Sequence, residues 1–255
     1  MKKFLTIAGS DASGGAGIQA DIRTATLHGL YSMSIITALT AQNTTGVQGI
    51  APTDPAFVAK QTDSVFSDIR PDAIKIGMLA NAGVIRAVAE KLREHEGRNI
   101  VLDPVMVASS GAHLFDEEAV SVLKEDLISL ADVITPNIRE AEVLSGISIR
   151  NREEAVAAAA EIGKWYGGAI LITGGHFSES SDDLLYRQGE STWFCATRID
   201  NPNNHGTGCT FSSALACNMA LGYELTESVR RAKDYVRRAL ALQLDLGRGS
   251  GPLGF

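Results

Sequence analysis

Short apolar runs alternate with longer amphipathic stretches along most of the chain. The apolar runs predict strands at Lys3–Ala8, Ser32–Leu39, Ala73–Ile76, Asn99–Asp103, Asp132–Ile134 and Ala169–Thr173. The stretches between them repeat apolar residues every three or four positions and predict helices at Ile18–His28, Pro55–Phe66, Ala82–Glu94, Glu117–Leu127, Glu140–Leu144 and Glu153–Tyr166. This alternation is typical of βαβ units around a mostly parallel sheet, which places the chain in the α/β class.

The last third of the chain changes pattern. Two apolar runs, Leu184–Arg187 and Thr192–Ala196, lie close together and predict a hairpin, and two helices are expected at Thr207–Leu221 and Thr226–Leu246. The sequence contains no linker, internal repeat or long charge run. We therefore expect one compact domain over residues 1–255.

Composition and charge narrow the class of function. The 255 residues are 45% hydrophobic and 21% charged, enough for a substantial core, and the net charge is −7. An acidic chain without a Lys/Arg-rich run is not expected to bind nucleic acid, so small-molecule partners are favoured. The three cysteines form no CxxC pair, which indicates neither a disulfide framework nor a zinc site and favours the cytoplasm. The apolar stretch Phe4–Ala8 is too short for a signal peptide, and no run is long enough to span a membrane.

Polar residues and glycines follow the predicted strands, where α/β sheets bind their ligands. They lie at Gly9-Ser10-Asp11, Gln42-Asn43, Gly77-Met78, Asp103-Pro104, Thr135-Pro136-Asn137 and Thr173-Gly174-Gly175. We therefore predict a ligand site at this edge of the sheet.

The glycine-rich segment after the first strand matches a dinucleotide fingerprint at Gly15–Ala20. A nicotinamide site also needs an acidic residue about 20 positions later, and none occurs between Asp21 and Asp54. A phosphate-binding P-loop is also disfavoured, because the Gly163-Lys164 pair falls in a helical pattern. The glycines could simply permit a tight turn, but so long a run favours a loop that faces a ligand.

A second glycine motif, His205-Gly206-Thr207-Gly208-Cys209-Thr210, directly precedes a helix of small residues. Converging backbone N–H groups and the positive end of the helix predict an anion site that could stabilise a phosphoryl group during transfer. The same position is expected to lower the pKa of the Cys209 thiol, which would allow it to act as a base or a hydrogen-bond partner. The alternative is a buried structural cysteine.

Two pairs of polar residues have both a functional and a structural interpretation. Asn137 and Glu140 lie on one face of a helix start, where they could bind Mg²⁺ together with Asp103, or could form a capping box alone. Asp21 could bind a hydroxyl group of a ligand, and the Gln42 amide could pair with the edge of an aminopyrimidine ring. Equally, Asp21 could be solvated and Gln42 could bind backbone.

These motifs together resemble the hydroxymethylpyrimidine/phosphomethylpyrimidine kinase family of the ribokinase-like superfamily. The resemblance covers essentially the whole chain and rests on Ile7–Asp21, Thr37–Thr44, Asp103–Met106, Thr135–Asn137 and His205–Thr210. It implies a three-layer α/β/α kinase that uses MgATP to phosphorylate 4-amino-5-hydroxymethyl-2-methylpyrimidine and then its monophosphate, for thiamin biosynthesis. It also implies a homodimer. Ala12 stands where the family often has proline, which affects the stiffness of the loop only.

The resemblance further implies roles for individual residues. The pyrimidine pocket would be lined by Gly9, Asp21, Gln42, Met78 and Val105. The anion hole would consist of Gly206, Thr207, Gly208 and Cys209, with Cys209 as the catalytic residue. ATP and Mg²⁺ would be bound by Asp103, Asn137, Glu140, Thr173, Gly175 and Lys233, with Asp103 and Glu140 holding the metal largely through water. A pyridoxal/pyridoxine kinase, a dual-specificity enzyme and a vitamin-binding protein without catalysis remain alternatives.

Overall fold

The computed structural model describes residues 1–106, 117–174 and 181–255. Within these ranges the strands form one sheet in the order β3-β2-β1-β4-β5-β6-β7-β8-β9. Their bounds are β1 Lys3–Asp11, β2 Tyr31–Asn43, β3 Gly46–Pro52, β4 Ala73–Ile76, β5 Ile100–Leu102, β6 Val133–Ile134, β7 Ala169–Ile172, β8 Asp183–Arg187 and β9 Glu190–Phe194. The six strands from β2 to β7 in this order are parallel, and β3, β8 and β9 are antiparallel additions at the two edges.

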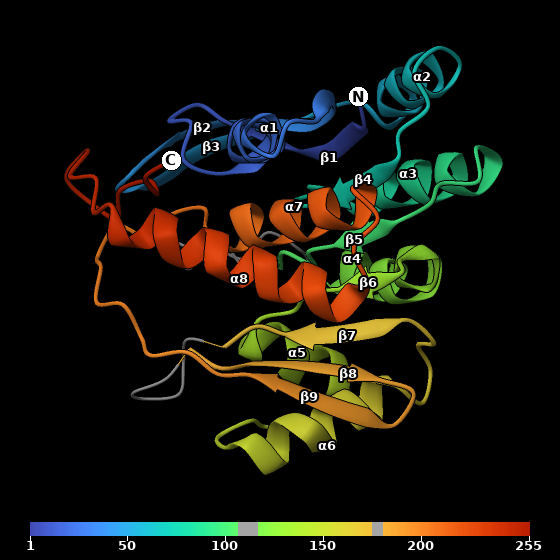
Figure 1. Cartoon of the computed structure of the whole chain (residues 1–255). Helices are drawn as coiled ribbons and strands as arrows, with labels where there is room; N and C mark the ends of the chain where they lie inside the picture. The colour runs from blue at the N-terminus through green and yellow to red at the C-terminus, as the bar shows by residue number, and fades with distance from the viewer. Residues whose placement is uncertain (107–116, 175–180) are drawn as a thin grey trace.

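Helices cover both faces of the sheet (Figure 1). Their bounds are α1 Gly17–Leu27, α2 Pro55–Phe66, α3 Ala82–Glu94, α4 Glu117–Val122, α5 Ile138–Ser145, α6 Arg152–Ile162, α7 Thr207–Ala220 and α8 Leu225–Ala241. Because successive side chains of a strand point to opposite faces, Leu5 and Ile7 join the core beneath α2–α6, whereas Phe4 joins the core beneath α1, α7 and α8. The predicted three-layer α/β/α fold with a mostly parallel sheet is confirmed.

The helix expected at Glu153–Tyr166 ends at Ile162 and the strand expected at Ser32–Leu39 continues to Asn43, and three further segments also differ from the predictions. Strand β3 was not expected, because most of its residues are exposed and it therefore lacks an apolar alternation. The helix expected at Glu117–Leu127 is α-helical only to Val122 and continues as a π-helical turn over Leu123–Leu127. The last helix ends at Ala241 and not at Leu246, because the chain turns back at Gln243, whose φ is +46°.

The segment after α8 returns to the carboxyl edge of the parallel strands. The Gly251 carbonyl accepts a hydrogen bond from the His205 N–H at 3.1 Å, and the Gly249 N–H donates to the Thr44 hydroxyl at 3.2 Å. The C-terminal segment thereby connects the loop before α7 to the end of β2. None of the helices in the described ranges is long and apolar enough to cross a membrane.

Candidate active site

A cavity of about 230 Å³ lies where the parallel strands end, beside the start of α7. Its volume is below the ~300–1,000 Å³ of pockets for drug-sized ligands and suits a small ring. Apolar side chains and polar groups share the wall, the main ones being Gly9, Gln42, Val47, Ile50, Met78, Asp103, Val105, Asn137, Glu140, His205, Gly206, Gly208 and Cys209. The cavity lies at the edge of the sheet where the sequence predicts the site.

Four of the five residues predicted to line the pyrimidine pocket do line this cavity: Gly9, Gln42, Met78 and Val105. At Gly9 the backbone approaches the opposite wall so closely that a Cβ atom would lie 3.3 Å from the Met78 sulfur. Val47 and Ile50 were not predicted as lining residues, because they belong to the unexpected strand β3.

Asp21, the fifth predicted residue, lies outside the cavity wall, and its carboxylate is fully buried. Its oxygens accept hydrogen bonds from Lys75 Nζ at 2.9 and 3.0 Å, from Thr6 Oγ1 at 2.6 Å and from Ser213 Oγ at 2.7 Å. Lys75 and Thr6 face α1 and α7 because they alternate with Ile74, Ile76 and Ile7, which face the other core. The prediction that Asp21 meets a ligand hydroxyl is thus corrected: its partner is a buried lysine.

The glycine motif before α7 forms a tight loop against the glycine-rich loop after β1. Gly206 has a φ of +82°, and a Cβ there would lie 1.9 Å from the Gly15 carbonyl oxygen, so only glycine fits. The Thr207 N–H and hydroxyl both donate to the Asn204 carbonyl. In the described part of the chain, no group accepts a hydrogen bond from the N–H of Gly208 or Cys209, and both residues line the cavity. This geometry supports the predicted anion site at these two amides.

The expected activation of the Cys209 thiol is contradicted. Burial raises the pKa of Cys209 to about 11, and the carboxylates of Asp21 and Asp103 add to the effect, whereas Lys75 opposes it. Cys209 is therefore a neutral thiol at pH 7, even though it stands at the start of α7. Loss of solvation and nearby negative charge both oppose ionisation of the thiol at this position.

Asp103 and Glu140 bring two buried carboxyl groups to the cavity wall. Burial raises the pKa of Asp103 to about 6 and the pKa of Glu140 to about 8, and the charge of Asp103 adds to the shift at Glu140. Glu140 and Asn137 also form the capping box of α5, so the structural interpretation holds and both residues still face the cavity. Two buried acids that face a cavity, with the Asn137 side chain beside them, fit the oxygen ligands and water shell of Mg²⁺.

Of the six residues predicted to bind ATP and Mg²⁺, Asp103, Asn137 and Glu140 line this cavity, whereas Thr173 and Lys233 are not among its lining residues. Thr173 lies beside Asn137 through a backbone bridge, but its side chain is not in the wall. Lys233 is buried on α8 and binds Asp183 Oδ2 at 2.5 Å, while the other oxygen of Asp183 accepts the Gly174 N–H at 2.7 Å. Gly175 lies outside the described residues. Contacts of these three residues with ATP stay predictions.

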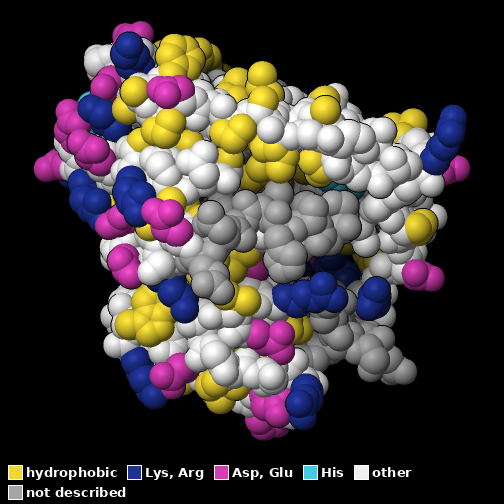
Figure 2. Space-filling view, turned by 180° about the vertical axis from the view of Figure 1, so that it is seen from behind, with side chains coloured by type: hydrophobic (Ala, Val, Ile, Leu, Met, Phe, Trp, Pro, Cys, Tyr) yellow, Lys and Arg dark blue, Asp and Glu magenta, His cyan; other side chains and the backbone are white. Residues whose placement is uncertain are grey.

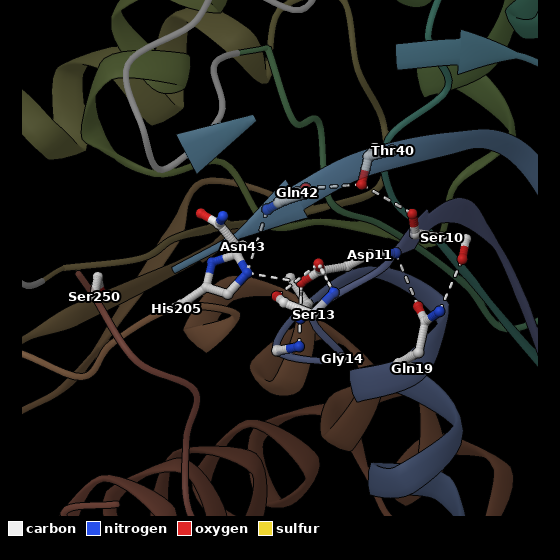
Figure 3. A network of polar contacts seen from close by, with 12 residues as sticks. Ser10, Asp11, Ser13, Gly14, Gln19, Thr40, Gln42, Asn43, His205 and Ser250 are labelled. Atoms are coloured by element: carbon white, nitrogen blue, oxygen red, sulfur yellow. Dashed lines mark hydrogen bonds and ion pairs between the residues drawn. The ribbon is translucent and has the colours of Figure 1, made fainter. Parts of the chain in front are cut away.

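Asp11 and His205, for which no individual role is predicted above, form the centre of a polar network (Figure 3). The Asp11 carboxylate accepts hydrogen bonds from the N–H groups of Ser13, Gly15 and Ala16, from the Ser13 hydroxyl and from the His205 ring at 2.8 Å. Burial alone would raise the pKa of Asp11, but the hydrogen bonds from His205 and Ser13 lower it to about 2. An acidic residue that opens a glycine-rich loop was the available sequence signal.

A small cavity that combines apolar side chains, the backbone of Gly208 and Cys209 and a pair of buried acids at the end of a parallel sheet is the arrangement of a small-molecule kinase of the ribokinase-like type. The family model for phosphomethylpyrimidine kinase matches residues 11–254. The chain belongs to the phosphomethylpyrimidine kinase family.

Individual relatives agree with this assignment. The chain is 51% identical to a bifunctional thiamine biosynthesis protein of Geobacter sulfurreducens, and the match covers 98% of this chain but only about half (51%) of that protein. It is 43% identical to the hydroxymethylpyrimidine/phosphomethylpyrimidine kinase of Haemophilus influenzae over 99% of this chain and 96% of the relative. The ADP complex of Bacillus subtilis pyridoxal kinase is 35% identical and superposes with a TM-score of 0.91, over 100% of this chain and 97% of that structure.

Proposed function

We propose that this kinase uses ATP and Mg²⁺ to phosphorylate the hydroxymethyl group of 4-amino-5-hydroxymethyl-2-methylpyrimidine, and then phosphorylates the monophosphate to the diphosphate, for thiamin biosynthesis. One observation supports it above the others: the Gln42 amide, the Asp103–Glu140 pair and the anion site line a single small cavity. The amide suits the aminopyrimidine edge, and the opposite groups suit a phosphoryl group and its metal.

The residues of the chain would act mainly by positioning and by electrostatics, as in phosphoryl transfer generally. Gly9, Met78 and Val105 would hold the ring, and Gln42 would orient it. The N–H groups of Gly208 and Cys209 would stabilise negative charge on the transferred group. Asp103 and Glu140, with Asn137, would hold Mg²⁺, which when bound neutralises phosphate charge. The neutral Cys209 thiol would line the site without acting as a base, since a loose transition state needs no strong base.

The nucleotide would lie toward Thr173, Gly175 and Lys233. Support for ATP as the donor comes from the ADP bound in the Bacillus pyridoxal kinase structure. We also propose one domain over residues 1–255, a cytoplasmic location, and no nucleic-acid or membrane partner.

The partner in the assembly would be a second copy of the chain. Strand β3 is an edge strand of the described sheet, and Leu39 of β2 and Ile50 of β3 expose 56% and 41% of their surface. Hydrophobic side chains gather along the upper rim of the molecule in Figure 2. An edge strand with exposed apolar residues supports a homodimer, because such an edge is normally covered or blunted.

Pyridoxal kinase is the second candidate, because the Bacillus enzyme shares the fold over the full chain. Both substrates are small heteroaromatic rings with a hydroxymethyl group. A binding protein without catalysis is the third candidate, and the complete acid pair and anion site argue against it.

Kinetics with hydroxymethylpyrimidine, its monophosphate and pyridoxal, compared side by side, test the proposal. We expect the two pyrimidines to give the higher kcat/KM, and Asp103→Asn to lower kcat about 100-fold or more by removing a metal-binding oxygen. Asp68→Asn is the matched control, because Asp68 is exposed and precedes β4 at the opposite edge of the sheet. Preference for pyridoxal, or no ATP consumption with any of the three compounds, would overturn the proposal.

A further inference from the structure

One nitrogen of the His205 ring faces two polar groups. His205 Nε2 lies 2.8 Å from Asp11 Oδ2 and 3.3 Å from the amide nitrogen of Gln42 (Figure 3). A neutral or charged imidazole nitrogen either carries a hydrogen or offers a lone pair, and it cannot do both. The two contacts therefore constrain each other.

The ionisation of Asp11 determines which atom of the His205–Asp11 contact carries the hydrogen. The carboxylate accepts four further hydrogen bonds and its pKa is lowered to about 2, so it is ionised and can only accept. His205 Nε2 must then carry a hydrogen and donate it to Asp11. An N–H cannot accept from the Gln42 NH₂ group, so the amide oxygen of Gln42 must face the ring instead. There it is the second, more distant acceptor of an N–H that is shared with Asp11.

The contact with Thr40, at the other end of the Gln42 amide, independently indicates the same orientation of the amide. The Thr40 hydroxyl lies 3.0 Å from the Ser10 carbonyl oxygen and 3.1 Å from the atom of Gln42 placed as its amide oxygen, Oε1. A carbonyl can only accept, so the single hydroxyl hydrogen of Thr40 goes to Ser10. The Thr40 oxygen is then an acceptor and needs the NH₂ group of Gln42. Exchanging the oxygen and nitrogen of the Gln42 amide satisfies both contacts. The two atoms of an amide are assigned from the hydrogen-bond network as a whole.

We propose that His205, held by Asp11, is a positioning residue that fixes the orientation of the Gln42 amide and thereby selects a ring whose edge combines an acceptor nitrogen with a donor amine. With Thr40 and His205 as its partners among the described residues, the amide keeps one N–H and one oxygen lone pair for a ligand. A ring with an oxo group in place of the amine would place this acceptor against the Gln42 amide oxygen, which is also an acceptor. The inference deepens the proposed function and rests on it for the identity of the ligand.

Without His205 the amide can rotate, so selection between the two edges should be lost more than binding itself. The test compares the 4-amino substrate with its 4-oxo analogue in wild type, His205→Phe, His205→Gln and Ser250→Ala. His205→Gln restores an N–H donor, and Ser250→Ala is the matched control, because Ser250 bonds Asn204 and Pro202 in the same loop and does not touch the ring.

We expect wild type to prefer the 4-amino compound at least about tenfold in kcat/KM, because a site built to hydrogen-bond a group discriminates strongly against its absence. His205→Phe should bring the ratio to within about threefold, through the KM for the pyrimidine, with the KM for ATP unchanged. His205→Gln should recover part of the ratio, and Ser250→Ala should keep all of it. A wild-type ratio in a folded His205→Phe variant would overturn the proposal.

Nuclear magnetic resonance of the ligand-free protein provides a second test that does not depend on the substrate. In ¹⁵N-labelled protein, the ring nitrogens of His205 should show a proton on Nε2, and His205→Phe should shift the side-chain NH₂ signals of Gln42. A His205 ring without a proton on Nε2 would overturn the network even in an active enzyme. Failure of wild type to phosphorylate either pyrimidine would refute the proposed function, while the resonances would still decide the orientation.

Discussion

Two groups of buried residues differ in the partners of their carboxyl groups. The first is built around Asp21, and the second around Asp103 and Glu140. Asp21 is fully buried and its oxygens are occupied by Lys75, Thr6 and Ser213. Asp103 and Glu140 are also buried, but within the described residues neither makes an ion pair, and both face the cavity. In the first group a lysine of the protein balances the charge of the carboxylate, whereas in the second no lysine or arginine among the described residues does so.

The difference shows how to separate a structural acid from a functional one. Burying a charge is costly unless the protein supplies a partner with good geometry. Where a lysine supplies it, as at Asp21, the acid stabilises the fold. Where the pKa values are raised and a cavity adjoins, as at Asp103 and Glu140, the acids have the features expected of a ligand site. Burial alone does not distinguish these cases, but the partners do.

The largest expected effect comes from removing the lysine partner of Asp21. Lys75→Met should lower the free energy of unfolding by about 3–5 kcal/mol, because it leaves the Asp21 carboxylate buried without its cation. Asp103→Asn is the matched variant and should not lower the free energy of unfolding, since it removes a buried charge that has no ion-pair partner. Urea denaturation measures both. Equal losses of unfolding free energy in the two variants would contradict the distinction between the two groups.

A pH effect of intermediate size should come from the second group. Raised pKa values mean that the folded state binds these two protons more tightly than the unfolded state, whose carboxyl groups titrate near pH ~4. Their contribution to stability is therefore present below about pH 4 and is lost as the pH rises through about 6 at Asp103 and about 8 at Glu140. We expect the melting temperature without metal to fall between pH 5 and pH 8.

Magnesium should act in the opposite direction in the same pH range. It binds the deprotonated acids, so its apparent affinity should rise with pH and its addition should flatten the fall in melting temperature. Thermal unfolding at several pH values, with and without Mg²⁺, measures this. Glu140→Gln is the control, because glutamine can still complete the capping box but does not titrate. A slope as steep in Glu140→Gln as in wild type would assign the pH effect to other groups.

The two carboxylate groups also show what could be predicted from the sequence. Buried strands such as β1 and β4 and the positions that follow them were predictable, because apolar runs and βαβ order determine which residues reach the carboxyl edge. The sequence does not show which face of α1 meets the sheet, so it could not tell that Asp21 pairs with Lys75, although a single lysine in the apolar strand Ala73–Ile76 implies a buried acid. The contact of His205 with Asp11 joins positions 194 residues apart, and no local pattern contains it.

The smallest expected effect concerns Cys209, which lies between the two groups and is influenced by both. The charge of Lys75 lowers its pKa and those of Asp21 and Asp103 raise it, but burial dominates and holds the pKa at about 11. A thiol that stays neutral below pH 9 cannot serve as a base there, so Cys209→Ser should lower kcat by less than about tenfold and keep the shape of the pH profile between pH 6 and pH 9. Cys195→Ser is the control, because Cys195 is exposed on the chain after β9. A loss of about a thousandfold in Cys209→Ser, together with a wild-type rate that rises in proportion to hydroxide up to pH 9, would restore the thiolate as the base. In that case a cation that binds together with the substrate would have to lower the pKa of the thiol, because the charges of the protein alone do not.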